Sequence, residues 1–359
     1  MRVLLTRLSA LGDIVHTWPL ADALARLRPA VELAWVVEEP LLPLVAGHPA
    51  VSRAIPVATR RWRAHPAAAA TREGIRAVRR ALREFAPEVA LDPQGLCKSA
   101  AWGWLAGAPE RIGVGRRVRR ERLAGTFYTR TVSPPDGVAH VVDFNLAMLD
   151  AFGAPAPYGA APDGRFLLAA NPRPAVAPGT VAILPGTGRA GKTWPGASYA
   201  ALARRVAADG RPAVVAWGPG ERELAASIVA AAGPGVTLAP PTGIAELAAL
   251  LAGCAAVVGG DTGPVHLAAA VGAPVVAIFL ASDPARNAPR GALVRLIDAA
   301  ARGGPPSRAR REARRDVEVA EVAGALDEVL ASAHAAAAEC GPRPEPDCDR
   351  TMRVGMLES

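Results

Sequence analysis

Short apolar runs, each bounded by Gly, Pro or polar residues, recur along the chain between segments with helical periodicity. The runs do not alternate between apolar and polar positions, which is the pattern of parallel strands buried on both faces. They are Arg2–Thr6, Val31–Val37, Val89–Asp92, Val181–Pro185, Ala213–Trp217, Ala255–Gly259 and Pro274–Leu280. Strands that alternate with helices along a chain predict an α/β fold with right-handed crossovers.

An irregular stretch divides this pattern in two. Residues 153–180 are rich in Pro, Gly and Ala, which is typical of a linker. We therefore predict two doubly wound, Rossmann-like domains, 1–165 and 175–335, that face each other across a cleft. A last helix is expected at 317–333, followed by a flexible tail at 336–359. Ligands of such sheets bind at the carboxyl ends of the strands.

The first predicted strand, Arg2–Thr6, is followed at once by the segment SALGDIVH, residues 9–16. Asp13 in this segment has two interpretations. Asp is a favoured helix cap, because its carboxylate accepts bonds from the free amides of the first turn. The alternative is a carboxylate at the edge of the cleft that removes a proton during catalysis.

The segment 259–267, GGDTGPVHL, follows a strand in the second half and leads into an Ala-rich helix. Its glycines allow a ligand to approach the backbone, and the free amides of the helix start favour an anion. Pro264 fits the first helical turn, where no amide donor is needed. A plain strand–turn–helix junction capped by Asp261 is the alternative interpretation.

A second glycine-rich segment, 186–195, also follows a predicted strand. Thr187 and Lys192 are both candidates for phosphate contact, the lysine as a mobile charge. The string GTGRAGKT formally matches the P-loop pattern. We discount a nucleoside triphosphatase, because Trp194-Pro195 interrupts the helix that a P-loop requires.

Composition indicates a globular, soluble protein. The chain has 359 residues, of which 51% are hydrophobic, and its 4 cysteines lack metal or disulfide spacing. Arg7, Asp13 and His16 interrupt the N-terminal apolar stretch, so no secretory signal is expected. The uncharged run 267–282 is too short for a membrane span.

The net charge of +8 is unevenly distributed, because 51–130 holds 17 Lys or Arg against 6 Asp or Glu. This excess predicts an anionic partner: nucleic acid, a membrane surface, or an acidic or phosphorylated substrate. Its densest runs are 60–63 (RRWR) and 116–120 (RRVRR). Such runs commonly form solvated faces, but Trp62 among arginines suits a carboxylated or phosphorylated sugar, or a nucleobase.

Taken together, the segments resemble the lipopolysaccharide heptosyltransferases of glycosyltransferase family 9. The resemblance covers the chain from Met1 to about Pro284 and rests on the order and spacing of several motifs. The motifs are 9–19 (SALGDIVHTWP), Trp35–Glu39, Ile55–Ala58 leading into Arg60–Arg63, Gln94–Leu96 with Lys98-Ser99, Lys192–Pro195 and Asp261–Leu267.

The resemblance implies a GT-B architecture and an inverting transfer of L-glycero-D-manno-heptose from ADP-heptose. The implied acceptor is a 3-deoxy-octulosonate (Kdo) of the lipopolysaccharide inner core, carried on lipid A. Asp13 becomes the expected general base, ionised beside a cationic acceptor site. Neither a metal nor another cofactor is expected.

The resemblance also assigns the remaining site residues. The donor set is Thr187, Gly188, Lys192, Glu221, Asp261, Thr262, Gly263 and His266, in which Lys192 also stabilises the leaving ADP. Either Glu221 or Glu223 meets the ribose, and we prefer Glu221. The acceptor set is Arg60, Arg61, Trp62, Arg63, Lys98 and Arg120, placed against Kdo carboxylates and lipid A phosphates.

Three positions depart from the family pattern. Arg7 stands where Lys is common, Ala10 where Ser is common, and 280–284 (LASDP) where the family has Gly-Pro-Thr-Asp-Pro. The last change affects the expected adenosine pocket.

Rival functions are a family member with a heptose acceptor, a sugar-nucleotide epimerase on the same scaffold, and a nucleic-acid binder. The basic cluster 60–63 argues against the first, and the absence of a recognised nucleic-acid motif against the last. We expect a cytoplasmic protein with peripheral contact to the anionic inner leaflet.

Overall fold

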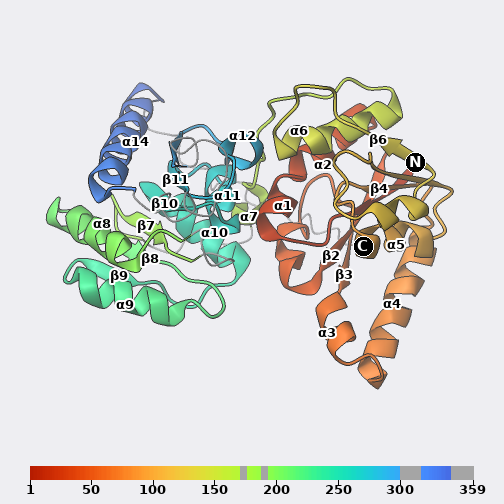
Figure 1. The fold of residues 1–359 in the computed structure, drawn as a ribbon, viewed down its shortest axis with the longest axis horizontal. Coiled ribbons are helices and arrows are strands. Elements are labelled where there is room, and N and C mark those ends of the chain that lie inside the picture. The colour runs from red at the N-terminus through yellow and green to blue at the C-terminus, as the bar shows by residue number, and fades with distance from the viewer. Residues whose placement is uncertain (170–175, 187–192, 300–316, 341–359) are drawn as a thin grey trace, which may run out of the picture.

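The computed structural model describes residues 1–169, 176–186, 193–299 and 317–340. Two six-stranded sheets, each covered by helices, lie side by side in two lobes (Figure 1). Their strand orders are β3-β2-β1-β4-β5-β6 and β12-β11-β10-β7-β8-β9, and every pair is parallel. Counted from its own first strand, each sheet has the order 3-2-1-4-5-6 of a doubly wound fold. The predicted α/β fold is confirmed.

Strands of the first lobe are β1 Arg2–Thr6, β2 Glu32–Glu38, β3 Arg53–Val57, β4 Val89–Asp92, β5 Glu110–Val114 and β6 Arg130–Val132. Its helices are α1 Leu11–Val15, α2 Trp18–Leu27, η1 Glu39–Leu44, α3 Thr59–Ala64, α4 Ala69–Phe85, α5 Cys97–Leu105, η2 Arg122–Phe127, α6 Val141–Leu146 and η3 Ala147–Phe152.

Strands of the second lobe are β7 Val181–Leu184, β8 Ala213–Val215, β9 Val236–Leu238, β10 Ala256–Gly260, β11 Val275–Phe279 and β12 Val294–Asp298. Its helices are α8 Gly196–Ala208, α9 Arg222–Ala232, α10 Ile244–Gly253, α11 Gly263–Ala270, α12 Pro284–Asn287 and α14 Val319–Cys340, and α7 Phe166–Ala169 precedes them.

All seven apolar runs form strands, with ends displaced by two residues at most. The runs missed β3, β5, β6, β9 and β12. Edge strands β3 and β12 include polar or Pro positions that face solvent, which an edge strand tolerates. The helix expected at 317–333 runs instead over Val319–Cys340, so the first residues of the expected tail are helical.

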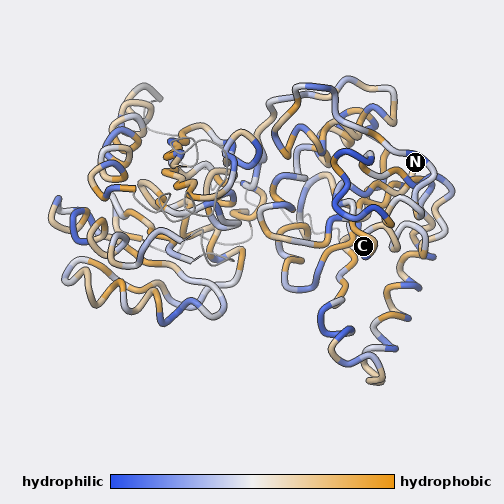
Figure 2. Tube along the Cα trace, in the orientation of Figure 1, coloured by the Kyte–Doolittle hydropathy of each residue, from blue (hydrophilic) through white to orange (hydrophobic). Residues whose placement is uncertain are grey.

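The expected linker packs between the lobes. Phe166 lies edge-on to Trp18 and His48 of the first lobe, at centroid distances of 5.2 and 4.8 Å. The Gly164 amide donates to Ala270 O of the second lobe at 2.8 Å. One buried apolar cluster includes residues of both sheets, so the lobes share a core at their junction. In Figure 2 the interior strands are mainly apolar in colour, whereas α3 and α4 carry many hydrophilic positions.

Candidate active site

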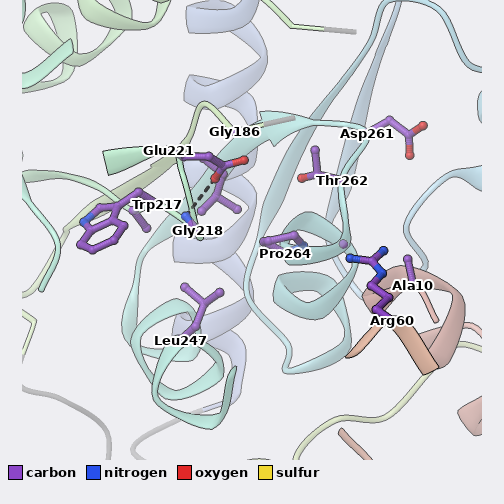
Figure 3. Close-up of a pocket in the computed structure, with 13 residues that line it drawn as sticks. Ala10, Arg60, Gly186, Trp217, Gly218, Glu221, Leu247, Asp261, Thr262 and Pro264 are labelled. Atoms are coloured by element: carbon purple, nitrogen blue, oxygen red, sulfur yellow. Dashed lines mark hydrogen bonds between the residues drawn. The ribbon is translucent and has the colours of Figure 1, made fainter. Parts of the chain in front are cut away.

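A cavity of about 550 Å³ lies outside the carboxyl ends of β7 and β10, the two neighbouring strands of the second sheet from which the chain order runs in opposite directions (Figure 3). This is the switch point of the strand order, where doubly wound sheets bind ligands. The lining residues are Ala10, Arg60, Leu184, Gly186, Ala216, Trp217, Gly218, Glu221, Leu247, Asp261, Thr262, Gly263 and Pro264. Ala10 and Arg60 belong to the first lobe, so both lobes build this cavity.

A glycine at the end of β10 lets this strand pack closely against its neighbours at the junction with α11. A Cβ on Gly259 would lie 2.8 Å from a Val265 methyl and 2.9 Å from Leu184 Cβ. Thr262 is extended before α11 and Pro264 lies in its first turn. The helix start therefore presents free amides to the cavity, which favours an anionic group.

Glu221 is placed by the loop after β8. Its Oε2 accepts from the Gly218 amide at 2.8 Å, and the carboxylate lines the cavity (Figure 3). A Cβ on Gly186 would lie 2.1 Å from Glu221 Oε2, so a larger residue at this position would displace the carboxylate. Glu223 is exposed in the first turn of α9 and is not part of the lining. The geometry favours Glu221 over Glu223.

A second cavity of about 420 Å³ adjoins the first and lies entirely in the first lobe. Its lining residues are Ser9, Ala10, Leu11, Glu38, Glu39, Pro40, Leu41, Ala58, Arg60 and Arg61. Ala10 and Arg60 line both cavities. A ligand bound in one cavity and a ligand bound in the other would therefore be in contact near these two residues.

Asp13 lies beside this meeting point. Its Oδ2 accepts from the amide of Ala10 at 3.2 Å, so Asp13 is not the N-cap of α1 but its third residue, which bonds back to the N-cap residue Ala10. Oδ1 lies 2.8 Å from Arg7 Nη2, and Oδ2 lies 3.7 Å from Arg120 Nη2. Burial alone would raise the pKa of Asp13, but the two guanidinium charges and the Ala10 amide outweigh it and leave the pKa below its ordinary value. Asp13 is therefore ionised at neutral pH.

Arg7 is the residue through which the first sheet holds Asp13. Its side chain is buried, and Nη1 donates to Pro93 O at 2.8 Å. Beside it, the Leu8 amide donates to Gln94 Oε1 at 2.8 Å. The loops after β1 and β4 thus bind each other across the switch point of the first sheet.

Asp92, at the end of β4, organises that loop from inside the protein. Its Oδ1 accepts from the amides of Gln94 and Gly95, and its Oδ2 accepts from Ser99 Oγ and Tyr128 Oη. Burial raises its pKa above the ordinary value despite these four bonds. Its bonds make Asp92 a support for the loop.

The predicted acceptor residues are not gathered in one place. Arg60 lines both cavities, and Arg61 lines the second and pairs with Glu39 at 3.0 Å. The structure places Trp62 in the lining of neither cavity: its indole is buried in an apolar cluster and lies edge-on to Trp102, and its contact with a ligand stays a prediction. Trp62 lies on the one buried face of the helix α3, whereas Arg61 and Arg63 are exposed.

Of the other acceptor candidates, one lies near the two cavities and two lie outside their lining. Arg120 is half-exposed beside Asp13. Arg63 and Lys98 are exposed and lie outside the lining of both cavities.

On the donor side, Asp261 contacts His266, another predicted donor residue, and Ser282, which was not a predicted site residue. Its Oδ1 lies 3.3 Å from His266 Nε2, and its Oδ2 accepts from Ser282 Oγ at 2.5 Å. Ser282 stands in the segment 280–284 that departs from the family pattern and keeps a hydroxyl there. His266 Nδ1 lies 3.1 Å from His16 Nε2 of the first lobe.

Thr187, Gly188 and Lys192 lie outside the described residues. Gly186, the residue before them, lines the first cavity. Among the described residues, no group of three His, Cys, Asp or Glu side chains is arranged to hold a metal ion.

The described helices include none long and apolar enough to cross a bilayer.

Comparison with known proteins decides the family. The sequence profile of glycosyltransferase family 9 (heptosyltransferase) matches residues 75–314. The chain belongs to glycosyltransferase family 9. It is therefore a glycosyltransferase, and the GT-B architecture expected from the resemblance is confirmed by the structures below.

Among sequence relatives, lipopolysaccharide heptosyltransferase 1 of Pseudomonas aeruginosa is 36% identical over 289 residues, covering 79% of this chain and 80% of the relative. The Escherichia coli K12 enzyme of the same name is 31% identical over 287 residues, covering 79% and 89%. Among solved structures, E. coli heptosyltransferase WaaC with ADP matches with a TM-score of 0.78 at 29% identity, covering 92% of this chain and all of that one. E. coli heptosyltransferase II shares the fold, with a TM-score of 0.73 at 21% identity.

Proposed function

We propose that this glycosyltransferase is a lipopolysaccharide heptosyltransferase I, which moves L-glycero-D-manno-heptose from ADP-heptose to Kdo of the inner core on lipid A. One observation carries the proposal: the two cavities meet at Ala10 and Arg60, and the Ala10 amide is bonded to the ionised Asp13. The relatives bear the same activity in their names, and one solved structure holds ADP.

ADP-heptose is assigned to the 550 Å³ cavity, with the diphosphate at the start of α11 and the ribose at Glu221. The Kdo acceptor is assigned to the 420 Å³ cavity, where Arg60 offers a cation to its carboxylate. Asp13 takes the proton of the acceptor hydroxyl as that oxygen attacks the anomeric carbon. The bond from this carbon to the diphosphate breaks on the opposite face, so the configuration inverts.

Thr187 and Lys192 remain predicted contacts of the departing diphosphate, because the segment that holds them lies outside the described residues. Independence from metals and cofactors also remains a prediction.

The test is an ADP-release assay with chelator present, run with ADP-heptose and one of two acceptors. Turnover that requires Kdo-lipid A supports the proposal. Turnover only on a core that already carries heptose would assign a heptose acceptor instead. Consumption of ADP-heptose without any acceptor would favour the epimerase alternative.

We further propose that α4 contacts the anionic cytoplasmic leaflet that carries the acceptor. Together with α3, this helix projects from the first lobe (Figure 1). Its arginines are exposed on one stripe at helical spacing, opposite the buried face: Arg72, Arg76, Arg79, Arg80 and Arg83. Within the described residues, the last four form no ion pair with a carboxylate. Such a stripe fits anionic headgroups.

Vesicle flotation tests this contact without substrate. The triple variant R76Q/R79Q/R83Q is compared with R204Q/R211Q/R222Q, which removes equal charge from the second lobe. At about 1 kcal/mol per basic residue, the first variant should bind anionic vesicles roughly 100-fold more weakly at low salt. The second variant should bind like the parent protein. Equal binding by both variants would exclude α4 as the contact.

A further inference from the structure

A chain of polar side chains crosses from the first lobe to Asp261 of the second lobe, which lines the first cavity. It begins at His16, the residue that ends α1, whose Nε2 lies 3.1 Å from His266 Nδ1 on α11. His266 Nε2 lies 3.3 Å from Asp261 Oδ1, and Ser282 Oγ donates to Asp261 Oδ2 at 2.5 Å. His16 has no part in the function proposed so far.

The helices that carry the two histidines are packed backbone to backbone. A Cβ on Gly12 of α1 would lie 3.0 Å from His266 Cδ2 and 3.5 Å from Gly263 Cα. Both histidines are nearly inaccessible, with 4% of His16 and 5% of His266 exposed. The contact between the two rings is therefore largely shielded from bulk water.

The protons along this chain follow from the carboxylate at its end. A carboxylate oxygen accepts hydrogen bonds, so we assign the hydrogen of His266 to Nε2, which faces Asp261. With its hydrogen on Nε2, His266 presents the lone pair of Nδ1 to His16. Burial, followed by the nearby His266, His140 and Arg7, lowers the pKa of His16 well below its ordinary value, although Asp261 acts to raise it. A neutral His16 therefore has one N–H to donate, and Nε2 is the atom that meets His266 Nδ1.

We propose that His16 is a positioning residue for the donor. By donating to His266 Nδ1 it fixes the tautomer of His266, and His266 in turn holds the Asp261 carboxylate in place against the heptose of the donor. This inference rests on the proposed function, since it takes Asp261 as a donor contact. Asp13 lies in α1 and His16 is its C-cap, so one short helix carries both the proposed general base and the residue that contacts His266 of the other lobe.

Kinetics of two substitutions separate positioning from simple packing. His16→Phe keeps an aromatic ring but has no donor, whereas His16→Gln keeps an N–H that reaches the place of Nε2. We expect kcat of His16→Phe to fall about 10- to 100-fold with KM for ADP-heptose within about threefold, because the carboxylate is misplaced rather than removed. His16→Gln should restore kcat to within about threefold of the parent.

His48→Phe is the matched control. It also replaces a buried histidine, of which 2% is exposed, in the packing of Trp18 and Phe166. It should lower the melting temperature and leave kcat unchanged. An equal loss of kcat in His16→Phe and His16→Gln, in parallel with their melting temperatures, would overturn the proposal in favour of a packing role.

A second measurement needs no turnover, so it separates this inference from the proposed function. The six histidines of ¹⁵N-labelled protein give a resolvable set of ring-nitrogen signals, and His266→Gln assigns that of His266. His266 should be the Nε2–H tautomer in the parent, in His16→Gln and in His48→Phe, and a mixture in His16→Phe. An unchanged Nε2–H tautomer in His16→Phe would overturn the proposal whether or not the protein transfers heptose.

Discussion

The two sheets have the same strand order but use their switch points in opposite ways. In the second sheet the crevice between β7 and β10 is an open cavity of about 550 Å³, lined by glycines and a free helix start. In the first sheet the crevice between β1 and β4 is filled by the protein itself, through Arg7, Asp92 and Gln94. One crevice is built to receive a ligand, and the other to hold a carboxylate.

The difference follows from the size of the residues in the loop after the first strand of each sheet. Gly186 after β7 leaves room for Glu221, whereas Arg7 after β1 extends to Pro93 and Asp13. A buried guanidinium with fixed partners loses little freedom when a substrate arrives, which preorganises the base. The doubly wound sheet therefore supplies both a binding site and a rigid support in one chain.

The largest effect on kcat is expected from substitution of Asp13, the carboxylate that the first crevice holds. Asp13→Asn keeps the size of the side chain but accepts no proton, so kcat should fall about 10²- to 10⁴-fold. KM for ADP-heptose should change little, because Asp13 lies in the first lobe. Initial rates of ADP release measure both. Asp136→Asn, at a side chain that is 97% exposed, is the control. A kcat near that of the parent would remove Asp13 as the base.

The next largest effect is expected from substitution of Arg7, the buried guanidinium that holds Asp13. Arg7→Met removes the charge nearest to Asp13 and leaves burial to raise the pKa of that carboxyl. In the parent this pKa is below the ordinary 3.8, so the rate should be flat through neutral pH and fall only in acid. In Arg7→Met the acid limb should move to higher pH, and kcat at pH 7 should fall about 10- to 100-fold.

Arg7→Lys is the comparison for this profile, because Lys keeps a charge near Asp13. Its acid limb should stay close to that of the parent. A limb that stays in place in Arg7→Met as well would show that Arg120, at 3.7 Å, is sufficient to keep Asp13 ionised.

These two crevices also show what a single sequence can predict. The strands of both sheets that are buried on both faces were recognisable as unbroken apolar runs, and the segments after β1 and β10 correctly located Asp13 and the Thr262–Pro264 turn beside the cavities. Edge strands β3 and β12 were missed, because the exposed residues Pro56 and Arg295 interrupt their apolar runs.

The parts of the site that sequence did not reveal depend on contacts between distant residues. The direction of the Trp62 side chain is set by the packing of α3 on Trp102, not by its arginine neighbours. His16 and His266 are 250 residues apart, and Arg7 and Pro93 are 86 apart. His16 does lie within the segment SALGDIVH, and its place there was the only local signal.

A smaller effect is expected at the open crevice. Glu221→Gln removes the charge of a side chain that lines the cavity. The loss of one hydrogen bond from the ribose to a charged group should raise KM for ADP-heptose about tenfold. Glu223→Gln changes an exposed residue two positions away and should leave KM within about twofold. Competition by ADP gives the same comparison without an acceptor. Equal effects of the two substitutions would remove the ribose assignment of Glu221.

The smallest effect is on stability, where the two crevices touch. A Cβ on Gly263 would lie 2.8 Å from Leu11 Cβ and 3.1 Å from the Gly12 amide, so Gly263→Ala must push α1 and α11 apart. Such overpacking costs about 1–3 kcal/mol, which should lower the melting temperature by several degrees. Gly324→Ala in α14 meets no atom within 4 Å and should raise stability slightly, since Ala is the better helix former. If Gly263→Ala melts at the parent temperature, α1 and α11 can separate enough to accommodate the added methyl group without loss of stability. The two crevices would then not be held together by a rigid contact between these helices.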